Sequence, residues 1–301
     1  MENITETFVI NLKECKKRMA AIDKNLTEQN IRYTRWEAIK GKDMNIVDVH
    51  ENTSMMCRKF LCNNGIIGCF MSHKLLWKHI ATKYGNDNYT WVLVLEDDAK
   101  LVKGFKDNLA NVFYEMHDWP SGVMYPEFIH LACNIFCNLG TITPHIFHSV
   151  VVNTTRAYLI SAAGASKLIR IFPTINYHVD ASISINQILH RNLGYYTTNN
   201  FVTNNDGQIS SISINSFPRI LPDFLNLLLV KGLGFDAVNI LFESPVVSFE
   251  KTINVNIAVF IFILIVAFLI AKGLYTWASM YVLIEIIYYT VTQKMKGNNE
   301  C

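Results

Sequence analysis

The first forty residues alternate between short apolar runs and a helical pattern. Residues 8–12 (FVINL) are a short apolar run bounded by polar residues, which is typical of a β-strand. Residues 13–30 predict an amphipathic helix, because apolar residues recur there at helical spacing: Met19, Ile22 and Leu26. Residues 31–39 are strand-like, and Gly41 ends them. A strand, helix and strand in this order predict a parallel sheet with the helix as crossover.

The next pattern leads to a buried strand that ends in acids. Residues 42–64 are polar and contain turn-forming residues, so we expect a loop there. Residues 65–85 begin with glycine and then show helical periodicity at four positions: Phe70, Leu75, Leu76 and Ile80. After a turn at 85–88, residues 91–95 (WVLVL) form a continuous apolar run, which is typical of a strand buried on both faces.

Further alternation follows. Residues 128–133 and 149–153 have strand patterns, and residues 155–172 begin as a strand and become helical near Ser161. Residues 199–216 are polar and rich in asparagine, so we expect a long loop near a site or a sheet edge. Strands that alternate with helices favour an α/β fold over an all-β fold or a helical bundle.

The C-terminal part is strongly apolar. Residues 253–271 contain no charge, and as a helix they would be about 28 Å long, close to the ~30 Å of a bilayer core. We expect them to span a membrane; the alternative is a buried core helix. Residues 273–292 carry Glu285 and either span as well or lie at the interface. Three aromatic residues would then form the interfacial belt: Tyr275, Trp277 and Tyr281.

These patterns predict two parts, a domain at 1–250 and a membrane anchor at 251–301. Residues 1–7 are polar, and the apolar run after them is too short for a secretory leader. Because of the apolar C-terminal segment, we expect the lipid bilayer to be a partner. Because no leader is recognised, we expect the anchored domain to be cytosolic. The net charge is only +2, which argues against nucleic-acid binding.

The seven cysteines are spread along the chain. Two couples are closely spaced, Cys57 with Cys62 and Cys133 with Cys137, but no histidine or cysteine pair beside them has the usual spacing of a zinc site. We therefore expect free thiols in a reducing compartment.

Three consecutive acids follow the buried strand. Because side chains alternate along an extended segment, Glu96 and Asp98 should point to one side and Asp97 to the other. Carboxylates at the carboxyl end of such a strand suit Mg²⁺ or Mn²⁺ and leave coordination positions for phosphate oxygens. The same acids would serve a phosphohydrolase or a nucleotidyltransferase, and the alternative is an acidic loop that solvates the end of the strand.

Five motifs occur in order between residues 8 and 180, within a stretch of resemblance that covers roughly residues 8–212: FVINLKECKKR (8–18), GIIGCFMSHKLLWKHI (65–80), WVLVLEDD (91–98), AYLISAAGASKLI (157–169) and HVD (178–180). Together they resemble glycosyltransferase family 25. The resemblance implies an α/β fold of GT-A type, a Rossmann-like mixed sheet flanked by helices, here with a C-terminal hydrophobic membrane segment. It also implies a UDP-sugar donor and inverting transfer to a hydroxyl.

The resemblance assigns roles to the residues that match. Glu96, Asp97 and Asp98 would hold the metal and the diphosphate. Nucleotide-sugar binding would involve Asp97 and the residues that match earlier motifs: Asn11, Arg18, Ser72 and His73. Asp180 is the expected general base, with His73 as a second catalytic candidate near the donor or the metal.

We therefore expect a membrane-anchored transferase that moves galactose or glucose from a UDP-sugar to a glycan, glycolipid or protein hydroxyl. The cofactor would be a divalent cation, Mn²⁺ before Mg²⁺. Two alternatives stay open: a catalytically inactive, glycosyltransferase-like membrane protein, and the metal-dependent phosphohydrolase or nucleotidyltransferase.

Overall fold

The computed structural model describes residues 3–132, 139–149, 154–204, 216–225, 228, 245–249 and 253–297. The chain divides into two compact units. The first combines Met1–Thr53 with Ile66–Gln208, and the second combines Ser54–Gly65 with Ile209–Glu300. The division thus falls near residue 208 rather than at residue 250.

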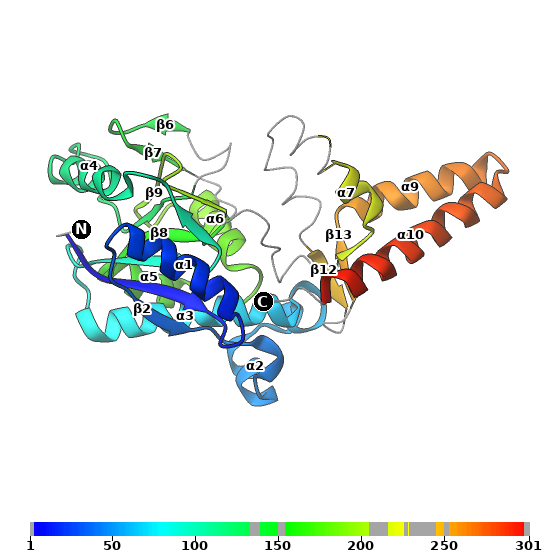
Figure 1. The fold of residues 1–301 in the computed structure, drawn as a ribbon, viewed down its shortest axis with the longest axis horizontal. Helices are drawn as coiled ribbons and strands as arrows, with labels where there is room; N and C mark the ends of the chain where they lie inside the picture. Colours follow the sequence, from blue (N-terminus) through cyan, green and yellow to red (C-terminus); the bar gives the residue numbers. More distant parts are fainter. Residues whose placement is uncertain are drawn as a thin grey trace. The chain divides into compact units, whose positions relative to one another are not determined.

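The first unit is built on an eight-stranded mixed sheet with strand order β2-β1-β3-β8-β5-β9-β7-β6 (Figure 1). Its strands are β1 (Ile4–Asn11), β2 (Thr34–Glu37), β3 (Trp91–Glu96), β5 (Phe128–His130), β6 (Gly140–Thr141), β7 (Ile146–His148), β8 (Ala157–Ser161) and β9 (Tyr195–Thr198). β1 is parallel to β2 and β3, whereas β8 is antiparallel to β3 and β5. The prediction of an α/β fold with a mixed sheet is confirmed.

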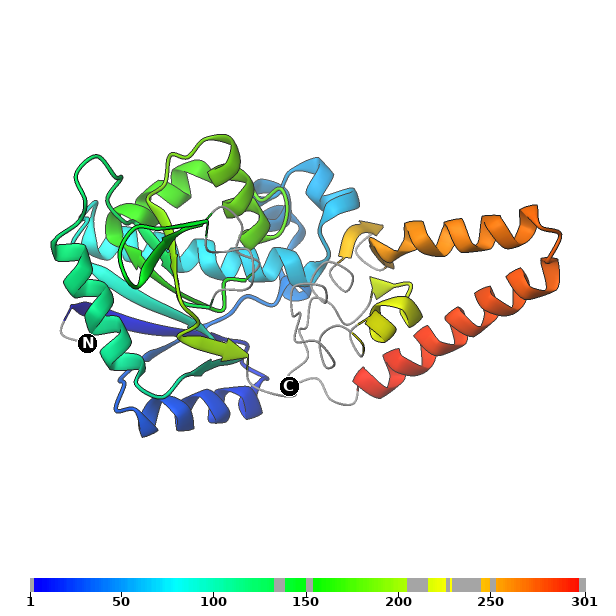
Figure 2. The same ribbon diagram turned by 90° about the horizontal axis from the view of Figure 1, so that it is seen from above.

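Helices cover both faces of this sheet. The helices that follow the strands are α1 (Lys16–Glu28), α3 (Asn64–Tyr84), α4 (Phe105–His117), α5 (Ala162–Ile171) and α6 (Val179–Leu189). A 3-10 turn, η1 (Gly41–Asp43), and a short, mostly exposed helix, α2 (Ile46–Asn52), precede α3. α1 and α4 share one core with Val9, Leu93 and Leu159. The alternate side chains face α3, where Trp77 of the helix donates a hydrogen bond to Tyr158 of β8. Figure 2 shows α1 and α3 on opposite sides of the strands.

Several predicted elements match the structure, and one prediction needs correction. Ser161 ends β8 and caps α5 by accepting a hydrogen bond from Gly164 N–H (3.0 Å), at the predicted change from strand to helix. The predicted loop at 42–64 is wrong, because it contains η1, α2 and the π-helical turn η2 (Cys57–Leu61). Asn45 caps α2 by accepting from Asp48 N–H (2.8 Å).

Two other predicted segments are only partly described. Residues 150–153 of the predicted strand at 149–153 lie outside the described residues, as do residues 205–215 of the predicted loop at 199–216. The described start of that loop contains β10 (Val202–Asn204), which pairs antiparallel with β4 (Ala99–Leu101).

The second unit contains a small sheet and a helical hairpin. The sheet has strand order β11-β13-β12, formed by β11 (Ser216–Phe217), β12 (Pro245–Phe249) and β13 (Ile253–Asn256). The helices are α7 (Ile220–Leu225), α9 (Ala258–Ala271) and α10 (Tyr275–Gly297), and α9 and α10 form the hairpin (Figures 1 and 2). Because β11 pairs with β13, residues near 216 belong to the same unit as the C-terminal segment. This pairing explains why the second unit begins before residue 250.

The predicted membrane span at 253–271 is not supported. Its first four residues form β13, and α9 has 14 residues, about 21 Å of helix. In the part of the chain that the structure describes, no helix combines the length and apolar character needed to cross a membrane.

Glu285 explains why the second apolar stretch contains an acid. Glu285 lies on α10, is fully buried, and accepts hydrogen bonds from the backbone N–H groups of Arg219 and Ile220, the latter at 2.9 Å. These groups lie at the start of α7, where backbone N–H groups lack helical partners and favour a negative charge. The carboxylate therefore fastens α10 to α7.

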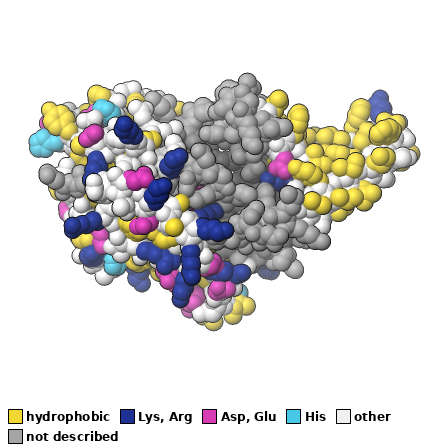
Figure 3. Space-filling model, in the orientation of Figure 1, with side chains coloured by type: hydrophobic (Ala, Val, Ile, Leu, Met, Phe, Trp, Pro, Cys, Tyr) yellow, Lys and Arg dark blue, Asp and Glu magenta, His cyan; other side chains and the backbone are white. Residues whose placement is uncertain are grey.

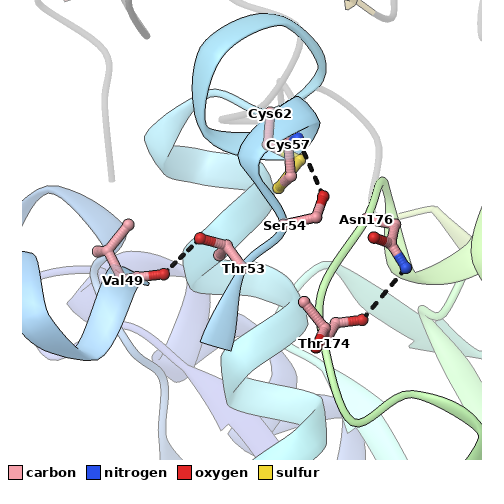
Figure 4. The surroundings of a disulfide bond; sticks show 7 residues. All are labelled: Val49, Thr53, Ser54, Cys57, Cys62, Thr174 and Asn176. Carbon is pink, nitrogen blue, oxygen red and sulfur yellow. Dashed lines mark hydrogen bonds between the residues drawn. A yellow bond between two sulfur atoms is a disulfide. The ribbon is translucent and has the colours of Figure 1, made fainter. Parts of the chain in front are cut away.

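The cysteines differ from the prediction. Cys57 and Cys62 form a disulfide across η2, and Ser54 Oγ accepts a hydrogen bond from Cys57 N–H (3.2 Å) where this turn begins (Figure 4). Cys15 is also disulfide-bonded, whereas Cys69 is a free thiol. The expectation of free thiols is therefore wrong for these three residues, and zinc binding by Cys57 and Cys62 is excluded. The couple Cys133 and Cys137 lies outside the described residues.

Gly68 allows α3 to approach the chain that follows β2. A Cβ atom at this position would lie 2.5 Å from Ile39 O and 2.6 Å from Gly41 N, which are both backbone atoms. Gly68→Ala should therefore lower the free energy of unfolding by about 1–3 kcal/mol through overpacking. Chemical denaturation measures the change.

Gly140→Ala is the matched control, because its Cβ would meet its nearest neighbour at 3.9 Å. Equal stability of the two variants would contradict the close approach of α3.

Candidate active site

The acidic residues lie at the edge of the sheet where parallel strands end. β1 ends at Asn11 and its parallel neighbour β3 ends at Glu96. β8 runs in the opposite direction and begins at Ala157, opposite Leu95, so Thr155 and Arg156 reach the same edge. In open α/β sheets, ligands bind outside the carboxyl ends of the strands. The predicted position of the acidic site is therefore the one that the fold favours.

Asp97 is held by β1 and α1. Asn11 Nδ2 donates to Asp97 Oδ2 (2.7 Å), and Arg18 Nη1 donates to Asp97 Oδ1 (3.2 Å). Arg35 Nε in turn donates to Asn11 Oδ1 (3.0 Å). Burial raises the pKa of Asp97, although Arg18 and Asn11 oppose this. Both oxygens of Asp97 thus have protein partners, so the structure favours a positioning role over the predicted contacts to metal or nucleotide.

Glu96 ends a chain of buried hydrogen bonds on the other side. Its Oε1 accepts from Thr155 Oγ1 (2.7 Å) and lies 3.2 Å from His73 Nε2. His73 Nδ1 lies 2.9 Å from the Tyr158 hydroxyl, which accepts from Trp77 Nε1–H (3.0 Å). Trp77 and His73 share one face of α3, as the sequence spacing predicts.

One arrangement of hydrogen-bond donors satisfies each group in this row of hydrogen bonds. An indole N–H can only donate, so the Tyr158 oxygen accepts from Trp77, and the Tyr158 hydroxyl donates a hydrogen bond to His73 Nδ1. With a single ring proton, His73 carries it on Nε2 and donates a hydrogen bond to Glu96. His73 therefore orients Glu96, and the buried Tyr158 orients His73.

Glu96 and Asp98 differ in their tendency to ionise. Burial opposes ionisation of Glu96, but the hydrogen bonds from His73 and Thr155 and the charges nearby outweigh it and lower its pKa. Burial raises the pKa of Asp98 to about 6, against the attraction of Arg156 and with the added repulsion of Glu96. Asp98 Oδ1 lies 3.4 Å from Arg156 Nε, and neither atom has a hydrogen-bond partner in the described part of the chain.

Asp180 lies in the first turn of α6, and its Oδ1 accepts from Ala181 N–H (2.7 Å). Burial raises its pKa; His178 opposes the shift, and the negative charge of Glu96 adds to it. The influence of Glu96 means that Asp180 lies within electrostatic reach of the strand-end acids.

Cys69 lies among these acids, although our sequence analysis assigned it no role. Burial raises the pKa of its thiol, and so do the charges of Glu96, Asp180 and Asp98. Its Sγ, a ring nitrogen of His73 and a Glu96 carboxylate oxygen all lie within 4.8 Å of one another. A usable sequence signal was present, because Cys69 and His73 are four residues apart on one helix and therefore share a face.

Ser72 is not brought to the site. Its hydroxyl donates to Gly68 O (2.7 Å) and accepts from Ile39 N–H (2.8 Å), so it joins α3 to the chain after β2. Conversely, sequence reasoning missed Thr155, Arg156 and Tyr158. Their contribution depends on the antiparallel pairing of β8 with β3, which no local pattern indicates.

An α/β sheet with carboxylates gathered at its carboxyl edge is typical of enzymes that bind phosphorylated ligands. The model of glycosyltransferase family 25 (LPS biosynthesis protein) matches residues 4–183, and this chain belongs to that family. The match includes Asn11, His73, the three strand-end acids and Asp180.

Individual relatives are similar over part of their length. The R655 protein of Acanthamoeba polyphaga mimivirus is 34% identical over 113 residues, which are 37% of this chain and 34% of that protein. Procollagen galactosyltransferase 1-A of Xenopus laevis is 29% identical over 182 residues, 56% of this chain and 29% of that one. A Bos taurus protein named "Probable inactive glycosyltransferase 25 family member 3" is 26% identical over 180 residues, 54% of this chain and 28% of its own. This chain thus spans about a third of the length of these relatives.

The raised pKa of Asp98 predicts how the free energy of unfolding depends on pH. Between pH 3.8 and 6, the unfolded state loses its Asp98 proton more readily than the folded state, so this group costs stability as the pH rises. Asp98→Asn should therefore stabilise the metal-free protein at pH 8, by about 1–3 kcal/mol, and the gain should shrink towards zero at pH 4. Urea denaturation in EDTA at both pH values measures it.

Asp118→Asn, which changes an exposed carboxylate, is the control and should show no such trend. A loss of stability in Asp98→Asn at pH 8 would contradict the burial cost.

Proposed function

We propose that this protein is a metal-dependent, inverting glycosyltransferase that moves a hexose from a UDP-sugar to an acceptor hydroxyl. The observation that carries the proposal is that Glu96 and Asp98 lie at the carboxyl edge of the sheet, with Asp180 within electrostatic reach of Glu96, in a family 25 chain. One relative is named for galactosyl transfer, so galactose is the first expected donor sugar and glucose the second. A glycan, a glycolipid or a protein hydroxyl would be the acceptor.

The acids at the sheet edge fit a divalent cation. Asp98 Oδ1 is buried without a hydrogen bond in the described part of the chain, and Glu96 is oriented by His73 and Thr155 while 26% of its side chain stays exposed. Carboxylate oxygens are the ligands of Mn²⁺ and Mg²⁺, with Mn²⁺ as our first expectation. Such a cation, when bound, supplies positive charge that offsets the departing diphosphate.

The remaining steps belong to side chains. Asp180 would accept the proton of the attacking hydroxyl, and a carboxyl group whose pKa is raised is better suited to this task near neutral pH. Arg18 holds Asp97 but stays partly exposed, so it can also meet a donor phosphate. His73 acts through Glu96, which it positions for the cation.

Two alternatives follow from the same residues. A phosphohydrolase or nucleotidyltransferase would use the same acids on another phosphorylated substrate. A relative that is named as inactive shows that family membership alone does not establish turnover, so an inactive protein that binds glycans is the second alternative. The carboxylates at 96, 98 and 180 argue against the inactive protein, and the family match favours the transferase over the phosphohydrolase or nucleotidyltransferase.

A donor screen tests the proposal. Wild-type protein with Mn²⁺ should release UDP from one UDP-hexose, and faster with an acceptor from a panel of glycans, glycolipids and peptides. Asp98→Asn should lower the rate at least 100-fold. Asp180→Asn should lower acceptor-dependent transfer by about 10²- to 10⁴-fold, because it removes the base.

Asp118→Asn should keep wild-type activity. If no UDP-sugar is turned over, the transferase proposal fails. Release of phosphate from nucleotides would then support the hydrolase, and glycan binding that is equal in the wild type and Asp98→Asn would support the inactive binding protein.

We also propose that the hairpin of α9 and α10 binds the surface of a lipid bilayer. Most side chains over these helices are hydrophobic (Figure 3), and three of them on one face of α9 are more than half exposed: Phe260 (63%), Leu264 (68%) and Phe268 (60%). Exposed apolar patches of this extent are typical of membrane or protein contacts.

The Cys57–Cys62 disulfide favours an oxidising compartment over the reducing, cytosolic one expected from the sequence.

Vesicle flotation tests the hairpin. Wild-type protein should float with phosphatidylcholine vesicles, and a variant that combines Phe260→Glu, Leu264→Glu and Phe268→Glu should stay in the dense fraction, because charges oppose insertion of the apolar face. The matched control, Tyr89→Glu with Tyr114→Glu, changes exposed aromatic residues of the first unit and should float. Equal flotation of the two variants would exclude the hairpin as the contact.

A further inference from the structure

We propose a second, softer cation site formed by Cys69, His73 and Glu96, which takes Zn²⁺ or a chemically similar ion. Cys69 Sγ, a ring nitrogen of His73 and a carboxylate oxygen of Glu96 lie within 4.8 Å of one another. Thiolate, imidazole and carboxylate are the three ligand types that Zn²⁺ uses in proteins. This donor set differs from the oxygen-only set that suits Mn²⁺ or Mg²⁺.

The arrangement is close to coordination distances. Cys69 and His73 lie one helical turn apart on α3, so both side chains point from the same face towards the end of β3. The 3.2 Å between His73 Nε2 and Glu96 Oε1 is near the ~3.4 Å that separates nitrogen and oxygen ligands of a tetrahedral zinc ion. A small rotation of the Cys69 side chain would complete a three-ligand site.

Two of the ligands are already oriented by their neighbours. The Tyr158 hydroxyl lies 2.9 Å from His73 Nδ1, and Thr155 donates to Glu96 Oε1 (2.7 Å). Zinc-bound histidines usually donate their second ring N–H to a fixed acceptor, which sets the tautomer. The Tyr158 oxygen, with its second lone pair, can take that place.

Proton balance follows from these contacts. Binding replaces the hydrogen bond from His73 Nε2 to Glu96 by two bonds to the ion, and His73 keeps one proton by carrying it on Nδ1, towards Tyr158. The Cys69 thiol gives its proton to solvent and binds as the thiolate. One proton is therefore released for each ion.

The surroundings favour a cation and leave it accessible. Asp98 and Asp180 lie within electrostatic reach of the Cys69 thiol and add negative charge. Cys69 and Glu96 are partly exposed, so an ion can reach the cluster from solvent. Because Glu96 belongs to both sets, Zn²⁺ and the cation of the proposed transferase would exclude each other.

Cobalt titration of the full-length protein, with EDTA removed, tests this site and does not depend on the proposed transferase activity. Wild-type protein should bind one Co²⁺ with a thiolate-to-cobalt absorption band in the near ultraviolet, and Zn²⁺ should displace it. Cys69→Ser should abolish the band, and His73→Gln and Glu96→Gln should each weaken binding at least tenfold. Circular dichroism of the metal-free variants separates loss of the site from loss of the fold.

The second histidine–glutamate pair of the first unit provides the matched control. His145 Nδ1 is hydrogen-bonded to Glu115 without a described thiol beside it, so His145→Gln should leave the cobalt band and affinity unchanged. The proposal is overturned if Cys69→Ser binds Co²⁺ with wild-type affinity and spectrum, or if wild-type protein binds without a thiolate band. Neither cobalt-binding result would change the outcome of the donor screen, so failure of the zinc-site proposal can be distinguished from failure of the transferase proposal.

Discussion

The opposite attachment of Glu96 and Asp97 is the constraint on which the site depends. Three adjacent carboxylates at the end of a buried strand and in the turn after it repel one another, so they can be held there only if hydrogen-bond donors meet them from different sides. Asn11 and Arg18 donate hydrogen bonds to Asp97 on the side of α1. His73 is hydrogen-bonded to Glu96 on the side of α3. The sheet edge thus distributes its negative charge between two helices, and Asp98 is left with an ion pair that makes no hydrogen bond.

Local periodicity was sufficient to predict the parts of the fold that depend on neighbours in sequence. The crossover from β1 through α1 to β2, the buried strand at 91–95 and the change from strand to helix at Ser161 are all of this kind. Glu96 and Asp97 have their partners on different helices, although Asp97 and Asp98 lie in the turn after β3 rather than in the predicted extended segment. Thr155 and Arg156 could not be placed, because they join the site only through the long-range pairing of β8 with β3. Ser72 was misplaced since its motif does not tell which face of α3 it occupies.

The C-terminal segment shows where apolar content alone misleads. The nineteen uncharged residues at 253–271 have the composition of a span, yet composition does not show that the first four pair with β11 and β12 in a sheet. Glu285 was the informative residue in this region. A buried carboxylate needs donors, and these are the free N–H groups at the start of α7.

α3 carries adjacent stripes with different tasks. Gly68 and Ser72 fasten the helix to the chain after β2, whereas Cys69 and His73, one position further on, face the acids. A single inserted or deleted residue within 68–73 would turn the rest of the helix by about 100°. Such a change would move Cys69 and His73 away from the acids and bring the face that carries Gly68 and Ser72 towards them. Length variation in homologous chains should therefore be absent from this turn of α3, even where the loops on either side differ freely.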